Sequence, residues 1–106
     1  MKQRLEQEEF AKNLNSTFKI RISESETVDC QLHEVTELLL SPRQERFAVV
    51  FRTSNDFYLD QGMRSFEHDV MGQFELFLVP VGRDEDGTYY EACFNRLVKK
   101  PQSPNP

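Results

Sequence analysis

Apolar and polar residues alternate along much of this chain with the period of two that is typical of β-strands. In residues 18–23, phenylalanine and isoleucine alternate with basic or polar residues, and residues 28–32 repeat the pattern after a polar turn. The apolar parity then shifts by one residue before Val35. This shift predicts a β-bulge at about His33 and Glu34, which would bend the strand in the way that barrels require.

Two runs, 47–52 and 74–81, are apolar on both parities. A strand needs apolar residues on both sides when both of its faces are covered, so we expect these runs to be central strands. Residues 82–87 hold three acidic residues between two glycines, a composition that favours a turn. The sequence therefore predicts a hairpin that joins 74–81 to 88–95.

The remaining segments are less apolar. Residues 2–13 favour a short helix, either a lid on one end of the β-core or an arm that binds a partner. Residues 53–62 read as a long loop pinned by its own aromatic residues. Residues 63–68 are expected to form an edge strand, because Phe66 is their one strong apolar residue. Three prolines predict that 99–106 are a disordered tail.

Length and composition fit one small domain. The chain has 106 residues, enough for a single modest core, which we expect within residues 1–98. Nine Phe and three Tyr, with no Trp, indicate a core built on phenylalanine rings. Short strands with hairpin-length links leave little room for parallel crossovers. The predicted fold is therefore mainly β: a small antiparallel β-barrel or rolled sheet of about six strands with one N-terminal helix.

Charge and hydropathy narrow the class of partners. The formal net charge is -5 and the pI is about 5.0, which argues against nucleic acid binding, since that affinity comes mostly from Lys and Arg. The first residues lack the apolar core of a signal peptide, and no run is long enough to span a membrane. We therefore expect a cytoplasmic protein that binds neither nucleic acid nor membrane.

Few residues suggest chemistry. His68 lies between Glu67 and Asp69, and the other histidine is His33. An imidazole beside carboxylates can act as a general base or bind a metal, so the alternative function is that of a small metal-dependent hydrolase or ligand-binding protein. Neighbouring strand residues point to opposite faces, however, so a solvent-edge or turn-capping role is favoured and no cofactor is expected. Cys30 and Cys93, which lie in separate predicted strands, occupy core-type positions. Buried thiols are favoured at both positions, and a disulfide between them stays open as the alternative.

Large side chains at loops or strand ends are the best binding candidates. Such side chains are costly to expose unless they pack or meet a partner. With no catalytic constellation visible, the sequence predicts a non-enzymatic module that binds another protein, or a copy of itself, through the edge strand and the aromatic loop. The predicted binding residues are Phe57, Tyr58, Leu59, Arg64, His68 and Tyr89.

The chain resembles an uncharacterised bacterial domain family of unknown function. The most specific pieces are Leu-Phe-Leu-Val-Pro-Val-Gly at 76–82 and Tyr-Glu-Ala-Cys-Phe-Asn at 90–95, and the similarity extends from 5 to 95. Genes of this family often lie near phage-tail-like or tail-collar-type genes, which implies an accessory or assembly role without enzymatic activity. The chain departs from the family pattern at Arg64, where the family has a more apolar residue.

Overall fold

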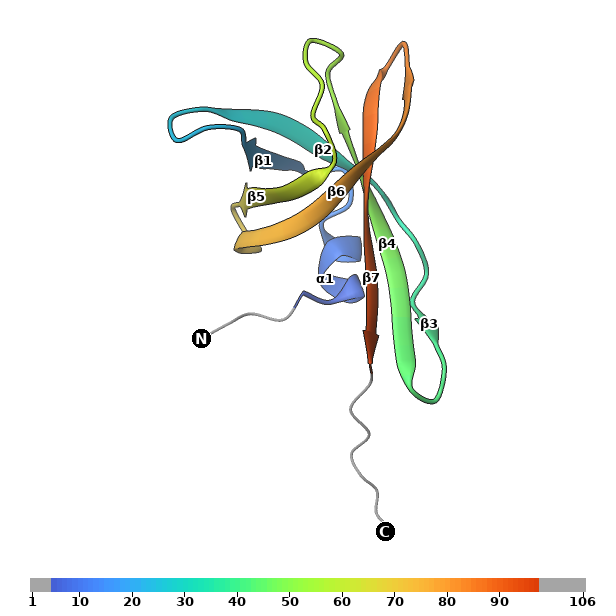
Figure 1. Ribbon diagram of the computed structural model, residues 1–106. Helices are drawn as coiled ribbons and strands as arrows, with labels where there is room; N and C mark the ends of the chain where they lie inside the picture. Colours follow the sequence, from blue (N-terminus) through green and yellow to red (C-terminus); the bar gives the residue numbers. More distant parts are fainter. Residues whose placement is uncertain (1–4, 98–106) are drawn as a thin grey trace.

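The computed structural model describes residues 5–97, so the predicted start of the helix at 2–4 and the predicted tail at 99–106 lie outside the described residues. One short helix is followed by seven strands (Figure 1). Their bounds are α1 Gln7–Lys12, β1 Thr17–Arg21, β2 Thr27–Val35, β3 Leu39–Leu40, β4 Gln44–Thr53, β5 Gly62–His68, β6 Gly72–Asp84 and β7 Gly87–Leu97.

Six of the strands close into an antiparallel barrel. The order is β2-β1-β5-β6-β7-β4, and β2 also pairs with β4, which completes the ring; β3 adds two residues to the outer end of β4. The register between β2 and β4 slips between Leu32 and Glu34, at the predicted bulge. The mainly β fold with about six strands and one helix is therefore confirmed, and the bulge lies where the change of parity placed it.

The predicted edge strand is not an edge. β5 pairs with β6 along its whole length and with β1 through the pair Ile20–Phe66 and its two neighbours. The prediction was wrong because a strand with few apolar residues suits an open edge, but it suits equally well a barrel strand that buries only one face. In β5, the buried position is Phe66.

The barrel interior is filled by aromatic rings, as the composition predicted. Phe18 packs edge-on against Phe51 at 5.2 Å between ring centroids, and Phe66 stacks on Phe74 at 5.5 Å. Rings at such distances add about 0.5–1.5 kcal/mol per pair beyond the burial of their area. Fully or almost fully buried apolar residues from five strands complete the core: Ile20, Cys30, Leu32, Phe47, Val49, Leu76, Leu78, Tyr90 and Ala92.

The predicted hairpin joins β6 to β7 through the two residues 85–86. The strands pair only from Val79–Glu91 up to Asp84–Gly87; below the Val79–Glu91 pair, β6 continues beside β5 while β7 continues beside β4 (Figure 1). The hairpin is thus confirmed, but its two strands separate towards the end of the barrel that faces α1.

Helix α1 covers the place where β6 and β7 separate. Its one buried residue is Phe10, whose ring lies 6.0 Å from Phe74 on β6, 5.6 Å from Phe94 on β7 and 6.2 Å from Phe47 on β4. Arg96 holds the approach to the helix by donating to the carbonyl oxygen of Leu5. The structure therefore matches the prediction of a lid on one end of the β-core.

The two cysteines are in different environments. Cys30 is buried in the core, where desolvation strongly raises the pKa of its thiol, and Cys93 is exposed on β7. Both are free thiols. The expectation of a buried thiol is correct for Cys30 and wrong for Cys93, because Cys93 has the outward parity of β7 while its neighbour Ala92 has the inward one.

Candidate protein-binding surface

One part of the outer face of β5 and β6 is apolar and exposed. Met63 and Phe77 are directly opposite each other in the ladder, and their exposed fractions are 59% and 49%. Val79 has the same parity as Phe77 and is half-buried, and Val81 follows at 52% exposure beside the irregularity that precedes Gly82. Opposed residues in an antiparallel ladder have side chains in contact range. We call these four residues the outer strip.

The outer strip is not among the binding residues predicted from the sequence, although the apolar pattern of 74–81 indicates it. The run 74–81 was expected to be covered on both faces, but only Leu76 and Leu78 are buried, with Phe74 half-buried. A closed barrel buries one face of each strand, so the second apolar parity must point outwards. A barrel strand that is apolar on both parities should therefore have predicted an exposed apolar surface at Phe77.

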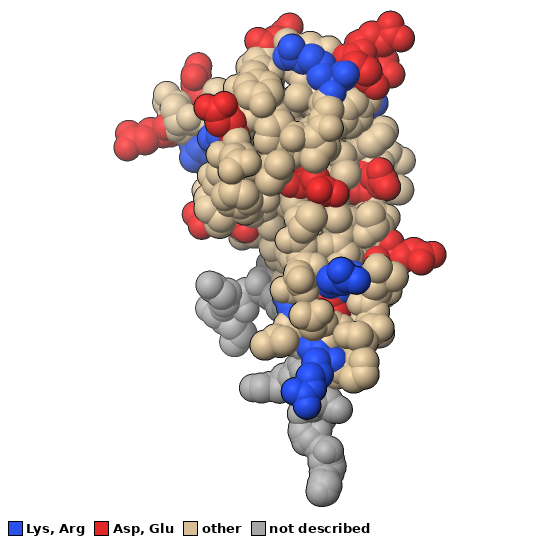
Figure 2. All heavy atoms as spheres, turned by 45° about the vertical axis from the view of Figure 1, so that its right-hand side comes forward, with Lys and Arg blue, Asp and Glu red and all other residues tan. Residues whose placement is uncertain are grey.

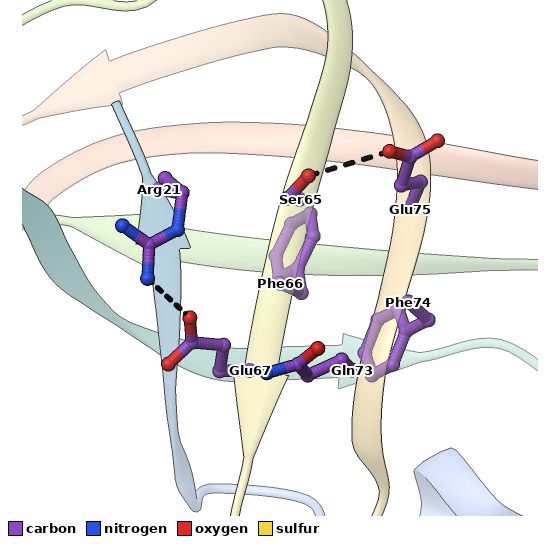
Figure 3. Close-up of a pocket in the computed structure, with 7 residues that line it drawn as sticks. All are labelled: Arg21, Ser65, Phe66, Glu67, Gln73, Phe74 and Glu75. Carbon is purple, nitrogen blue, oxygen red and sulfur yellow. Dashed lines mark hydrogen bonds and ion pairs between the residues drawn. The ribbon is translucent and has the colours of Figure 1, made fainter. Parts of the chain in front are cut away.

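Polar side chains follow the outer strip along β5 and β6 and continue onto β1; Figure 3 shows these polar side chains. Glu75 lies beside the strip and accepts a weak hydrogen bond from Ser65 at 3.4 Å, while Arg21 pairs with Glu67 at 2.7 Å. These side chains line a shallow hollow of about 320 Å³. Arg21 is paired with Glu67, so within residues 5–97 it leaves the carboxylate of Glu75 beside the strip without an ion pair.

The predicted binding loop is mostly turned inwards. Leu59 is buried in the core and its N–H donates to the hydroxyl oxygen of Tyr90 at 2.9 Å; Phe57 is half-buried against the core. Only Tyr58 is largely exposed, at 58%. The structure agrees with a loop pinned by its own side chains, and it leaves one of the three as a candidate contact.

Arg64 and Tyr89 lie apart from the outer strip. Arg64 has the inward parity of β5 and donates to the carbonyl oxygen of Asp60 at 2.6 Å, so it holds the loop that precedes β5. Tyr89 is half-buried, donates to the carboxylate of Asp84, and lies 5.0 Å from the ring of His33. Desolvation, and then the hydrogen bond to Asp84, raise the pKa of the Tyr89 hydroxyl. Both residues have partners within the fold.

His68 caps the turn between β5 and β6. Its Nδ1 accepts hydrogen bonds from the backbone N–H groups of Val70 and Met71, both at 3.1 Å. Nδ1 therefore carries no proton, and Nε2–H donates to Oγ of Ser16 at 2.9 Å. The ring stacks on Phe18 at 4.0 Å. Both nitrogens of this neutral imidazole are thus used to join the turn to the segment that follows α1, which is the turn-capping role that the sequence favoured.

The hydrolase alternative gains no support from the positions of these groups. His33 contacts the ring of Tyr89, whereas His68 contacts that of Phe18, so the two imidazoles have different surroundings. No cluster of three or more His, Cys, Asp or Glu side chains that could hold a metal ion occurs within residues 5–97. Within the same residues, no helix is long and apolar enough to cross a membrane.

The His68 cap predicts a loss of stability in mild acid. Burial lowers the pKa of His68 below its ordinary value of 6.5. The unfolded chain therefore takes up the proton first, so the stabilisation is complete above about pH 6.5 and is lost as the pH falls towards the lower folded pKa. Urea unfolding at pH 8 and pH 5 should show a smaller decrease for His68→Gln than for the wild type. An equal decrease in both proteins would contradict the assignment.

Comparison with known proteins gives a family without an assigned activity. Residues 5–94 match the family described as Domain of unknown function (DUF6916). Searches of curated proteins and of solved structures found no significant match. The matched range includes α1, all of the barrel strands up to Phe94, and the outer strip. Since it covers most of the chain, this protein belongs to the DUF6916 family.

Proposed function

We propose that this protein is a non-enzymatic protein-binding or assembly module, and that the outer strip is its contact surface. The observation that carries the proposal is the pairing of Met63 with Phe77 on the outside of the barrel, each about half exposed or more. Aromatic residues and methionine are enriched in protein interfaces. An apolar strand face that is exposed to water does not contribute to the core, so contact with a partner is the reason that it would have for being apolar. The strip therefore supports contact with another protein.

The surroundings of the strip suggest the chemistry of the partner. Glu75 borders the strip on one side, and Glu91 lies opposite Val79 on the other. A partner surface with an apolar centre and a basic rim would bury the strip and pair with these carboxylates. The resemblance noted in the sequence adds a setting, in which the protein serves as a cytoplasmic accessory of a phage-tail-like assembly. Figure 2 shows broad areas of the surface without Lys, Arg, Asp or Glu, which lie between small groups of charged residues.

Replacing both residues of the central pair should abolish partner binding. The double variant Met63→Ser with Phe77→Ser removes the apolar contact but changes no inward-facing residue, so the barrel should remain folded. A hot-spot residue at the centre of an interface contributes about 2 kcal/mol or more, so the loss of even one such contact lowers affinity by roughly 30-fold or more. The measurement is a pull-down with the tagged chain from an extract of the source cells, followed by calorimetry with the protein recovered at near-equal amount.

Two control variants locate the surface. Lys19→Ser changes an exposed residue on the same outer face, which forms a surface ion pair with Asp29 at 3.0 Å, and should leave binding unchanged. Phe57→Ala with Tyr58→Ala tests the loop that the sequence favoured. If the double serine variant retains its partner at full strength while the loop variant loses it, the contact surface is the loop and the assignment to the outer strip is wrong.

A further inference from the structure

One edge of strand β7 is paired with another strand along only part of its length. Its edge towards β4 is paired from Thr88 to Leu97, whereas its edge towards β6 is paired only up to Glu91. Along 92–97, the second edge therefore has no strand partner among the described residues. Figure 1 shows this part of β7 projecting with β4 beyond the barrel.

The hairpin register shows which backbone groups lie on this edge. The pair Asp84–Gly87 closes a two-residue loop, so it is a hydrogen-bonded pair, and in an antiparallel ladder such pairs alternate along each strand. Gly87 and the other odd-numbered residues of β7 then point their N–H and C=O groups towards the β6 side. Below Glu91, the groups without a ladder partner on that side are those of Cys93, Asn95 and Leu97.

This edge lacks the features that usually prevent strand addition. Residues 92–97 read Ala-Cys-Phe-Asn-Arg-Leu, without the Pro or Lys that natural edges use. The one charge, Arg96, has the inward parity and is paired with Glu45 at 3.0 Å. On the outer face, Cys93 is exposed, and Leu97, at 77%, is the most exposed of the large hydrophobic residues within 5–97. An apolar and unprotected edge of this kind is suited to pairing with another strand.

We propose that this edge of β7 pairs antiparallel with the same edge of a second copy of the chain, about a two-fold axis that passes through Asn95. In this register, Cys93 of each copy lies opposite Leu97 of the other, and the two Asn95 residues lie opposite each other. About six backbone hydrogen bonds would then form between the copies. The outer face of the joint brings apolar residues together and covers Leu97.

The sequence of the edge is complementary to itself in this register. On the inner face, Phe94 of one copy lies opposite Arg96 of the other, and the charge of Arg96 is neutralised within its own chain by Glu45. An axis through Arg96 would instead place two guanidinium groups opposite each other. An axis through Cys93 would place Glu91 opposite Asn95. The backbone groups of Glu91 on this edge are already paired with β6, so fewer backbone groups could pair between the copies. Of these three axes, the one through Asn95 fits the edge best.

The resulting dimer is expected to be reversible. Two short strand segments bury less area than the interfaces of stable dimers, so the dimer should form as protein concentration rises from the micromolar towards the millimolar range. This interaction uses a different surface from the outer strip, and it does not depend on the proposed function.

Asn95→Pro tests the dimer directly. The N–H of Asn95 points to the free edge, so proline removes a bond between copies without removing one to β4, while Asn95→Ala keeps the N–H and serves as the matched control. Light scattering and sedimentation over a range of concentrations should show a dimer for the wild type and Asn95→Ala, and a monomer for Asn95→Pro. A wild type that stays monomeric at millimolar concentration would overturn the proposal.

A charge exchange keeps the test decisive if the proline variant does not fold. The variant C93K with L97K places like charges opposite each other across the joint, and so does C93D with L97D. Each should be monomeric alone, and a mixture of the two should form a one-to-one heterodimer. All four substitutions are at exposed positions. If the mixture stays monomeric, or if either variant dimerises alone like the wild type, the predicted register is wrong.

Discussion

Replacing Phe10 with alanine is expected to lower the free energy of unfolding by about 3–5 kcal/mol, the usual cost of removing a fully buried phenylalanine. The ring contacts three strands at once through Phe47, Phe74 and Phe94, so no single neighbour can move in to fill the space. Chemical denaturation followed by circular dichroism measures the change.

Leu14→Ala is the matched control for this variant. Leu14 follows the same helix but is 42% exposed, so its replacement should change stability by about 0.5 kcal/mol or less. Phe10→Leu gives an intermediate value if the alanine variant is too unstable to measure. A Phe10→Ala protein as stable as the wild type would show that α1 is not needed to cover the barrel.

Gly87→Ala is expected to cost about 3–4 kcal/mol, for two reasons. Gly87 has a φ of +153°, a backbone conformation that residues with a side chain rarely adopt. An added Cβ would also lie against the carbonyl oxygen of Thr53, closer than real contacts allow, and 2.8 Å from Cγ of Arg52. Backbone cannot move aside as easily as a side chain, so the ladder between β4 and β7 must shift at its upper end. Thermal and urea unfolding would both report the loss.

Gly82→Ala separates crowding at this site from a general effect of glycine replacement in β6 and β7. No atom lies within 4 Å of the Cβ that would be added at Gly82. Its replacement should therefore be nearly neutral. Equal destabilisation by the two variants would mean that the close approach of Thr53 to Gly87 does not limit stability.

Much of the fold could be predicted from the sequence because local patterns encode it. Alternation predicted 18–23 and 28–32, and a slip in parity predicted the bulge. Glycines around acidic residues predicted a turn within 82–87, of which residues 82–84 and 87 belong to the strands and only 85–86 form the loop. These features depend on neighbours along the chain. The number of partners that a strand has depends on distant segments, and this is why Met63–His68 was wrongly expected to be an edge.

The candidate site was harder to predict for a related reason. Aromatic residues in a loop suggest exposure, but Leu59 and Phe57 pack onto the barrel, and a histidine between two carboxylates suggests chemistry, but His68 caps a turn. The loop contact comes from Tyr90, a residue far along the chain, whereas the cap of His68 is local and is a role that the sequence favoured. Met63 and Phe77 became recognisable only when the ladder placed them opposite each other on the outside.

The separation of β6 from β7 also has a consequence for protein quality control. Within residues 5–97, α1 is the element that covers the place where these strands part, and Phe10 lies between Phe74 and Phe94. If α1 detaches, these rings become accessible beside the strand edges that β6 and β7 leave free below Glu91, which is the combination that seeds intermolecular β-sheets. Time-dependent thioflavin T fluorescence in Phe10→Ala but not in Leu14→Ala would reveal this. The six-residue helix would then act as a guard against amyloid-like aggregation.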